Sequence, residues 1–183
     1  MILQKTAIDG VFLIILKRFD DNRGYFITTF HHDFLQKEIG INYQMKQLNQ
    51  AFNKVKGTLR GMHFQKGPHA ETKLVRCVQG AIYDVVLDLR PDSKQYGQWV
   101  AQELSSENDT LFFIPKGLAH GYQTLTDNAI VEYAVDEFYH PESSAGVRFD
   151  DQAFKIDWPT DSPILSERDR SWPLINSAAP GPT

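Results

Sequence analysis

His63 is the residue whose type and surroundings best suit chemistry, and it lies in the segment GTLRGMHFQ at residues 57–65. An imidazole titrates close to neutral pH, so it can accept a proton as a general base. A histidine on a strand is more often an ordinary core or surface residue, so the prediction depends on its neighbours. If the segment is a strand, the residues alternate between two faces, with Gly61, His63 and Gln65 on one and Arg60, Met62 and Phe64 on the other.

A second histidine, His120, lies in the segment IPKGLAHG at residues 114–121. This segment reproduces the PxGxxH turn that carries the second histidine of the cupin superfamily. The first cupin motif usually reads HxH followed by a glutamate, whereas this chain has Gln65 two residues after His63. Zinc and iron sites need three or more nitrogen, sulfur or carboxylate ligands, and an amide is a poor substitute. The resemblance therefore favours a cupin without a metal.

Short segments along the chain occur in a recognisable order with nearly ungapped spacing, and they extend over residues 1 to about 175. They are NRGYF, QLNQ, LRGMHFQ, KLVRCVQG, YGQWV, ELSSEN, IPKGLAHG and IDWP. Together they resemble the dTDP-4-dehydrorhamnose 3,5-epimerase family and distinguish it from cupins in general. The resemblance implies an all-β, cupin-type jelly roll with a few short helices. It also implies a homodimer with strand exchange near the N-terminus, and catalysis without a metal or other cofactor.

The reaction implied by this resemblance inverts carbons 3 and 5 of a 4-keto-6-deoxyhexose attached to a nucleoside diphosphate. Both carbons flank the ketone, so proton removal gives an enolate that must be stabilised and then reprotonated from the opposite face. By resemblance, His63 is the base and Asp169 orients its imidazole. Lys73, expected on the strand next to that of His63, is the cation near the sugar oxygens. Tyr133 is the acid, since a phenol can deliver a proton and yet stay neutral at rest.

Each of these partners has a simpler interpretation when it is taken alone. Asp169 lies in a charged run, where a solvated loop carboxylate is the default. Lys73 would be a surface lysine on a strand edge, and Tyr133 would be a core aromatic residue. The complete, ordered set of segments favours the functional interpretation over these.

Substrate binding is predicted at eight further positions. Seven match family positions that contact the base, the diphosphate or the sugar, and the eighth belongs to an aromatic pair, residues 138–139, that can stack on a ligand. Arginine suits a diphosphate because a guanidinium can donate two hydrogen bonds to phosphate oxygens. The eight residues are Arg23, Phe26, Gln47, Asn49, Arg60, His120, Tyr139 and Arg168.

Two positions depart from the family pattern. Thr28 stands where the family usually has a glutamate, and Ala134 stands where a lysine commonly follows the tyrosine. These departures leave the nucleotide base and the substrate open. The closest alternative is a sibling activity on the same scaffold, which inverts one carbon only, moves the ketone between carbons 3 and 4, or uses another base.

Two alternatives from other classes also remain. One is a sugar-binding cupin without catalytic activity, in which ligand binding would survive the loss of His63. The other is a metal-dependent cupin, in which His69 and Glu71 complete a ligand set with His63 and His120.

Asp84 is the remaining polar residue of interest, because it shares a strand face with Ile82 and Val86 in the apolar run AIYDVVLDLRP. A buried carboxylate needs a partner. One hypothesis is that Asp84 holds a site histidine or Arg60 in place. An edge-strand aspartate facing water is an equally good interpretation.

The elements that must position these residues are mainly strands. Residues 81–91 and 129–139 alternate apolar and polar side chains and are rich in β-branched and aromatic residues, and residues 11–16 form a short apolar strand. Turn-rich segments between them predict an antiparallel sandwich or barrel. Residues 31–40 are the one predicted helix, with Gly40 as its C-terminal stop.

Composition limits the remaining possibilities. A chain of 183 residues predicts one domain, over residues 1–175, and the Pro/Gly-rich residues 176–183 predict a loose tail. The net charge of −4 and the scattered basic residues argue against a nucleic-acid partner. No segment approaches the ~20 apolar residues of a membrane span, and no signal peptide is recognised, so we expect a cytoplasmic protein without a membrane partner. The lone Cys77 predicts a half-buried thiol and no intrachain disulfide.

Overall fold

The computed structural model describes residues 1–175, so the predicted tail at 176–183 lies outside the described residues. Two short 3₁₀ turns, at Gly67–His69 and Pro141–Ser143, accompany the helices α1 (His32–Ile39) and α2 (Glu167–Ser171). The strands are β1 (Ile2–Lys5), β2 (Phe12–Ile15), β3 (Arg18–Asp21), β4 (Gly24–Ile27), β5 (Gln47–Asn53), β6 (Leu59–Gln65), β7 (Lys73–Gln79), β8 (Ala81–Asp88), β9 (Trp99–Ser105), β10 (Thr110–Ile114), β11 (Leu118–Thr124), β12 (Ala129–Val135) and β13 (Ser144–Gly146).

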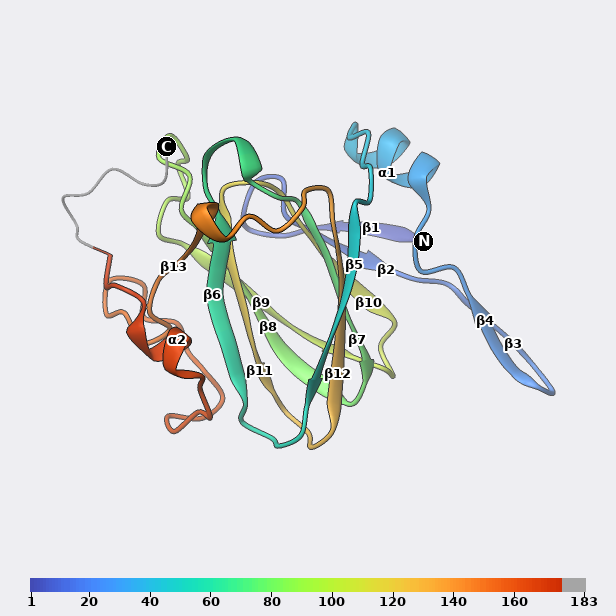
Figure 1. Cartoon of the computed structure of the whole chain (residues 1–183). Helices are drawn as coiled ribbons and strands as arrows, with labels where there is room; N and C mark the ends of the chain where they lie inside the picture. The colour runs from blue at the N-terminus through green and yellow to red at the C-terminus, as the bar shows by residue number, and fades with distance from the viewer. Residues whose placement is uncertain (176–183) are drawn as a thin grey trace.

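These strands form two facing antiparallel sheets and a separate ribbon (Figure 1). The larger sheet has six strands in the order β1-β2-β10-β7-β12-β5, and the smaller sheet has five in the order β13-β6-β11-β8-β9. The predicted all-β jelly roll is therefore confirmed. None of the described helices is long and apolar enough to cross a membrane.

The predicted elements agree with the observed ones apart from their ends. The strand expected at 11–16 is β2, and the strand expected at 81–91 is β8. The strand expected at 129–139 is β12, which already ends at Val135. The predicted helix is α1: the side chain of His31 caps it by accepting a hydrogen bond from the Phe34 amide, and Gly40 ends it with a φ of 79°.

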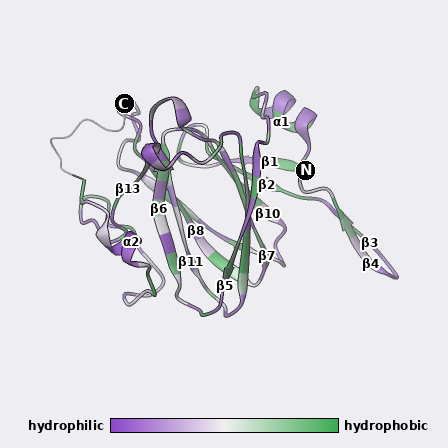
Figure 2. Cartoon of the chain, viewed as in Figure 1, coloured by the Kyte–Doolittle hydropathy of each residue, from purple (hydrophilic) through white to green (hydrophobic). Residues whose placement is uncertain are grey.

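Three apolar clusters stabilise the fold. The first lies between the two sheets and includes the fully buried Ile82 and Phe112. The second lies on the outer face of the smaller sheet, where Phe154 and Trp158 from the C-terminal segment cover it. In the third, Leu35 of α1 packs beside strand residues of the larger sheet. The rest of α1 is mostly hydrophilic (Figure 2). Because both faces of β8 are covered, its polar residues are buried rather than solvated.

The ribbon of β3 and β4 projects from the body of the molecule (Figure 1). Its base is anchored by Arg18, whose guanidinium donates to both carboxylate oxygens of Asp109 at 2.7 and 2.8 Å. The same guanidinium stacks on Tyr25 at 3.9 Å from the ring centroid. Large apolar side chains on the ribbon, among them Phe19 and Phe26, are more than half exposed.

Cys77 is more deeply buried than predicted, because β7 lies inside the larger sheet and its Cys77 side chain belongs to the core between the sheets. Its thiol donates to the carbonyl of Gln79 at 3.1 Å. Burial raises the pKa of this thiol to about 11, so it stays protonated and unreactive at neutral pH.

Candidate active site

Two adjoining cavities lie between the sheets and contain most of the predicted site residues. The first has a volume of about 280 Å³ and the second about 410 Å³, and His63, Lys73, Tyr133 and Arg168 line both. The first cavity is lined by Ala51, Arg60, His63, Lys73, His120, Tyr122, Tyr133, Ser166, Arg168 and Asp169. The second is lined by Gln47, Asn49, His63, Phe64, Gln65, Glu71, Lys73, Tyr133, Val135, Tyr139, Ser144 and Arg168.

The simple alternation predicted for β6 is wrong for Arg60. Strand β6 pairs with β11 so that His63 is opposite His120 but Arg60 is opposite Tyr122, and three steps along β6 therefore match two along β11. The extra residue forms a β-bulge in β6, and across it the side chains change the face of the sheet to which they point. As a result Arg60 and His63 line the same cavity, while Met62 is buried in the cluster behind the smaller sheet, as its predicted face requires.

The His63 imidazole makes a short hydrogen bond through Nε2 to Oδ1 of Asp169. The interpretation of Asp169 as a solvated loop carboxylate is wrong, because it is buried and lies on α2, whose first turn is capped by Ser166 accepting from the Asp169 amide at 3.1 Å. Trp172 donates its indole N–H to the same carboxylate at 3.3 Å. Burial raises the pKa of Asp169, but the hydrogen bond and charge of His63, with smaller contributions from the Ser166 and Trp172 hydrogen bonds, outweigh this and leave it below its ordinary value. The carboxylate is therefore charged and faces an imidazole that it can orient.

The hypothesis for Asp84 is confirmed in the form that involves His120. Both Asp84 oxygens lie within hydrogen-bonding distance of His120 Nε2, at 3.0 and 2.9 Å, and the Asp84 side chain is fully buried. Burial raises the pKa of Asp84, although the charge of His120 and that of Lys73 oppose the rise. The alternative of a water-facing edge aspartate is wrong, because β8 lies between β11 and β9 and Asp84 shares its face with Ile82 and Val86 of the core between the sheets.

Lys73 does not lie on a strand next to that of His63. It begins β7 of the larger sheet, whereas His63 lies on β6 of the smaller one, so the two side chains face one another across the sandwich. Neither is Lys73 a surface lysine, because its side chain is only 9% exposed. Its ammonium group pairs with Oε1 of Glu71 at 3.0 Å. The site thus holds a buried, paired cation opposite the base.

Tyr133 on β12 lines both cavities and also packs against the core between the sheets. Burial raises the pKa of its phenol, the nearby negative charge of Glu71 raises it further, and Arg60 opposes both effects. The phenol is therefore neutral at physiological pH and can act as a hydrogen-bond donor or an acid.

Six of the eight predicted substrate-binding residues line the two cavities. The backbone amide of Tyr139 donates to the Gln47 side chain at 2.8 Å, which joins the segment after β12 to β5. The Arg168 guanidinium donates to the Ser144 hydroxyl at 2.6 Å. The six are Gln47, Asn49, Arg60, His120, Tyr139 and Arg168.

The other two predicted residues, Arg23 and Phe26, lie on the projecting ribbon and do not line these cavities. Arg23 pairs with Asp21 of the same ribbon at 2.6 Å, and the Phe26 residue is 68% exposed. Alternation and spacing cannot foresee this, because the ribbon leaves the body that contains the other six. Within one copy of the chain these residues are therefore not brought to the site.

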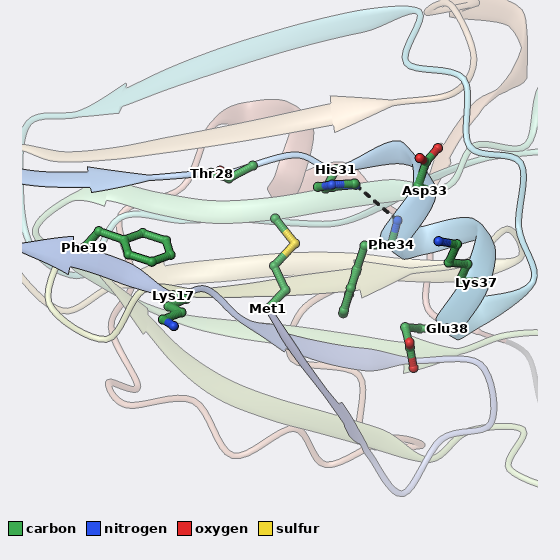
Figure 3. A pocket seen from close by; sticks show the side chains of 9 residues that line it. All are labelled: Met1, Lys17, Phe19, Thr28, His31, Asp33, Phe34, Lys37 and Glu38. Carbon is green, nitrogen blue, oxygen red and sulfur yellow. Dashed lines mark hydrogen bonds between the residues drawn. The ribbon is translucent and has the colours of Figure 1, made fainter.

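A further cavity of about 590 Å³ lies between the ribbon, the N-terminus and α1 (Figure 3). Thr28, at which the chain departs from the family pattern, lines it together with Met1, Phe19 and Phe34. None of the predicted catalytic residues lines this cavity.

The four residues of the metal alternative do not converge in the described part of the chain. His63 and His120 each bond to a carboxylate instead. His69 stacks on His140 with ring centroids 3.5 Å apart, and together with Glu142 they bring potential ligand atoms within 4.8 Å of one another. The two imidazole rings are stacked with an angle of 16° between their planes. The lone pairs of their ring nitrogens therefore lie in nearly parallel planes and do not converge on one ion. These residues do not fit a three-ligand site.

Sequence reasoning missed several contacts around the site. The Trp172 ring lies beside His63, with ring centroids 6.0 Å apart in an edge-to-face arrangement. Gln65, considered only as a missing metal ligand, donates its amide to Oε2 of Glu71 at 3.2 Å. For α2 a signal existed, because the segment beginning at Ser166 has the spacing of a helix N-cap. No local signal marks the contacts of Trp172 or Glu71.

Comparison with known proteins is consistent with this geometry. A family model described as dTDP-4-dehydrorhamnose 3,5-epimerase matches residues 5–177. The enzyme of that name from Methanothermobacter thermautotrophicus is 44% identical over 171 residues, covering 92% of this chain and 91% of the relative. A dTDP-4-dehydrorhamnose 3-epimerase from Streptomyces niveus is 35% identical over 178 residues, covering 97% of this chain and 86% of the relative.

Solved structures show the same likeness. The 3,5-epimerase of Legionella pneumophila in complex with dTDP-4-keto-L-rhamnose superimposes with a TM-score of 0.91 at 36% identity. This match covers 97% of this chain and 94% of the other.

Proposed function

The chain belongs to the dTDP-4-dehydrorhamnose 3,5-epimerase family, and we propose that it inverts carbons 3 and 5 of a dTDP-linked 4-keto-6-deoxyhexose without a cofactor. It would act in the cytoplasm, in deoxysugar biosynthesis. The observation that carries the proposal is the His63–Asp169 pair on a cavity whose other walls present Lys73 and Tyr133. These are the base, cation and acid that enolate chemistry requires.

Proton removal is assigned to Nδ1 of His63. Because Nε2 donates its hydrogen to Asp169, the lone pair of the neutral ring lies on Nδ1. The charged Asp169 then stabilises the imidazolium that forms when the proton is taken from carbon 3 or carbon 5.

The enolate oxygen is stabilised by positive charge that is already present in the resting site. Lys73 supplies a buried ammonium, and the guanidinium of Arg60 lines the same cavity. Groups that are held in place before the reaction stabilise the developing charge without reorganisation. Tyr133 then delivers a proton from the face opposite His63, which inverts the carbon.

The nucleotide is proposed to lie in the second cavity. Gln47 and Asn49 offer amide groups there, Tyr139 offers a stacking surface, and Arg168 lies where both cavities meet and can bind the diphosphate. A thymine base is proposed on the strength of the relatives' names, although Thr28 departs from the family pattern.

A homodimer is proposed to complete the site. Arg23 and Phe26 are predicted to bind substrate but lie on a ribbon that projects away from their own cavities (Figure 1). Exchange of ribbons between two copies would bring both residues to the partner's cavities and cover the exposed ribbon aromatics.

Incubation with dTDP-4-keto-6-deoxyglucose in deuterated water tests the proposal. We expect deuterium at carbons 3 and 5 and formation of the 4-keto-rhamnose product. A folded protein that incorporates deuterium at neither carbon would rule out the proposed reaction. Incorporation at carbon 3 alone would identify the second candidate, a 3-epimerase, which the similarity to the Streptomyces niveus enzyme favours.

A further inference from the structure

Glu71 is an acidic residue of the cleft to which the proposed reaction gives no role. Its side chain is only 13% exposed and lines the second cavity, at the point where the chain enters β7. Oε1 lies 3.0 Å from Nζ of Lys73. A buried ammonium without a counter-charge is costly, so this pairing favours a charged Lys73 before the substrate arrives.

Gln65 holds the other oxygen of Glu71. The Gln65 amide nitrogen lies 3.2 Å from Oε2 of Glu71 and 3.0 Å from the carbonyls of both His69 and Phe138, so three acceptors share its two hydrogens. The Gln65 side-chain oxygen accepts from the His140 amide at 2.7 Å, and Gln65 is itself buried. Both oxygens of Glu71 therefore have a partner within hydrogen-bonding distance, Lys73 for Oε1 and Gln65 for Oε2, and these contacts restrict the carboxylate and the Lys73 ammonium.

Glu71 also acts on Tyr133, which lines the same cavity. After burial, the charge of Glu71 is the main influence that raises the pKa of this phenol, and Arg60 is the influence that lowers it. The other acid among the cavity residues, Asp169, is already paired with His63. The ionisable groups lining the two cavities with Tyr133 are Arg60 and His63 of β6, Lys73 of β7, His120 and Tyr122 of β11, Arg168 and Asp169 of α2, Glu71, and Tyr139 after β12.

We propose that Glu71 is a positioning residue for this epimerisation, which fixes the Lys73 ammonium group and places a negative charge in the cavity that Tyr133 lines. The inference rests on the proposed function, because it assigns Glu71 to the cation and the acid of that reaction. It adds a residue that the sequence suggested only as a metal ligand.

Glu71→Gln tests this because it removes the charge and changes the size of the side chain very little. We expect kcat to fall by about tenfold or more, as for loss of a charge-assisted contact. Loss of the neighbouring anion should lower the pKa of Tyr133. The high-pH limb of the kcat–pH profile, in which activity is lost, should therefore move to lower pH. KM should change by less than about threefold. Glu71→Asp, which keeps the charge, should restore the position of this limb.

The matched control is Glu132→Gln. Glu132 is the neighbour of Tyr133 on β12 but points away from the cavities, and it pairs with Arg76 at 2.7 Å. This control should leave the high-pH limb in place. Thermal melting and dTDP binding establish that each variant is folded.

Unchanged kcat in Glu71→Gln, a rise in kcat, or a fall in kcat without movement of the limb would each overturn the proposal. Deuterium incorporation by the wild-type protein separates the two claims. If the wild type incorporates none, the proposed function fails. If it does, and Glu71→Gln behaves like the wild type, only the role of Glu71 fails.

Discussion

Asp84 and His120 form a buried pair in which both carboxylate oxygens face one imidazole nitrogen, at 3.0 and 2.9 Å. Asp84 lies on β8 and His120 on the adjacent β11, so two neighbouring strands of the smaller sheet hold the pair. His120 in turn lines the first cavity. The carboxylate therefore fixes the orientation of a histidine that the substrate would contact.

Asp84→Asn should lower kcat by about 10- to 100-fold, because it replaces the two carboxylate oxygens that face His120 Nε2 with one oxygen and an NH2 group, which disturbs the orientation of the ring. The variant should remain folded, since an amide is close in size to a carboxylate. Steady-state kinetics together with nitrogen NMR of the His120 ring check this. If kcat is unchanged although the orientation or the pKa of the His120 ring has changed, His120 does not act on the substrate.

Asp169→Asn should reduce kcat by at least about 100-fold, because an amide can donate to Nε2 and would move the lone pair of His63 away from Nδ1. The stability effect depends on pH. The pKa of Asp169 is lowered in the fold, so the ionised group stabilises the folded state above its unfolded pKa of about 3.9, and this contribution is lost as pH falls through the folded value. Urea unfolding should therefore show a wild-type advantage at pH 7 that shrinks below about pH 4. A constant difference across pH would contradict this.

Tyr133→Phe should separate proton removal from inversion. His63 would still exchange protons, so substrate recovered from deuterated water should carry deuterium, while formation of inverted product should fall by about 100-fold or more. His63→Ala should abolish both. NMR of the recovered sugar nucleotide measures the two outcomes. Tyr96→Phe, a hydroxyl deletion at a partly exposed position outside both cavities, serves as the control and should behave like the wild type.

Gly61→Ala should destabilise the protein more than Gly24→Ala. Both glycines have positive φ, 145° and 130°, so both substitutions carry backbone strain. A Cβ at Gly61 would also lie 2.5 Å from the Cα of Gly121 on β11, whereas one at Gly24 would meet nothing within 4 Å. We expect the difference in unfolding free energy to be about 1–3 kcal/mol. Equal values in denaturant titrations would show that the close approach of β6 and β11 costs little to relax.

Mixing experiments should reveal the proposed ribbon exchange. A subunit carrying Arg23→Ala and Phe26→Ala should be nearly inactive, as should one carrying His63→Ala. When the two are unfolded and refolded together, a mixed dimer has one site with both native contributions, so roughly a quarter of wild-type activity should return. If no activity returns although mixed dimers form, Arg23 and Phe26 do not act across the interface.

The sequence determined the types of residue that are present for chemistry and the elements that carry most of them. His63 and His120 could be singled out because strand alternation and turn motifs are local patterns. Periodicity and capping residues also predicted the strands β8 and β12 and the helix α1. A partner for Asp84 could be anticipated too, because a carboxylate in an apolar run requires one.

Only the tertiary structure decided how these residues meet. The bulge in β6 turned Arg60 into the cavity, and the pairing of the sheets placed Lys73 opposite His63 rather than beside it. Asp169 reaches His63 across 106 residues of chain. Each outcome depends on strand register and on packing between distant segments, whose energies are not encoded in any short stretch of sequence. The same reason explains why local patterns alone could not show that the ribbon carrying Arg23 leaves the body of the molecule, although the family resemblance implied strand exchange near the N-terminus.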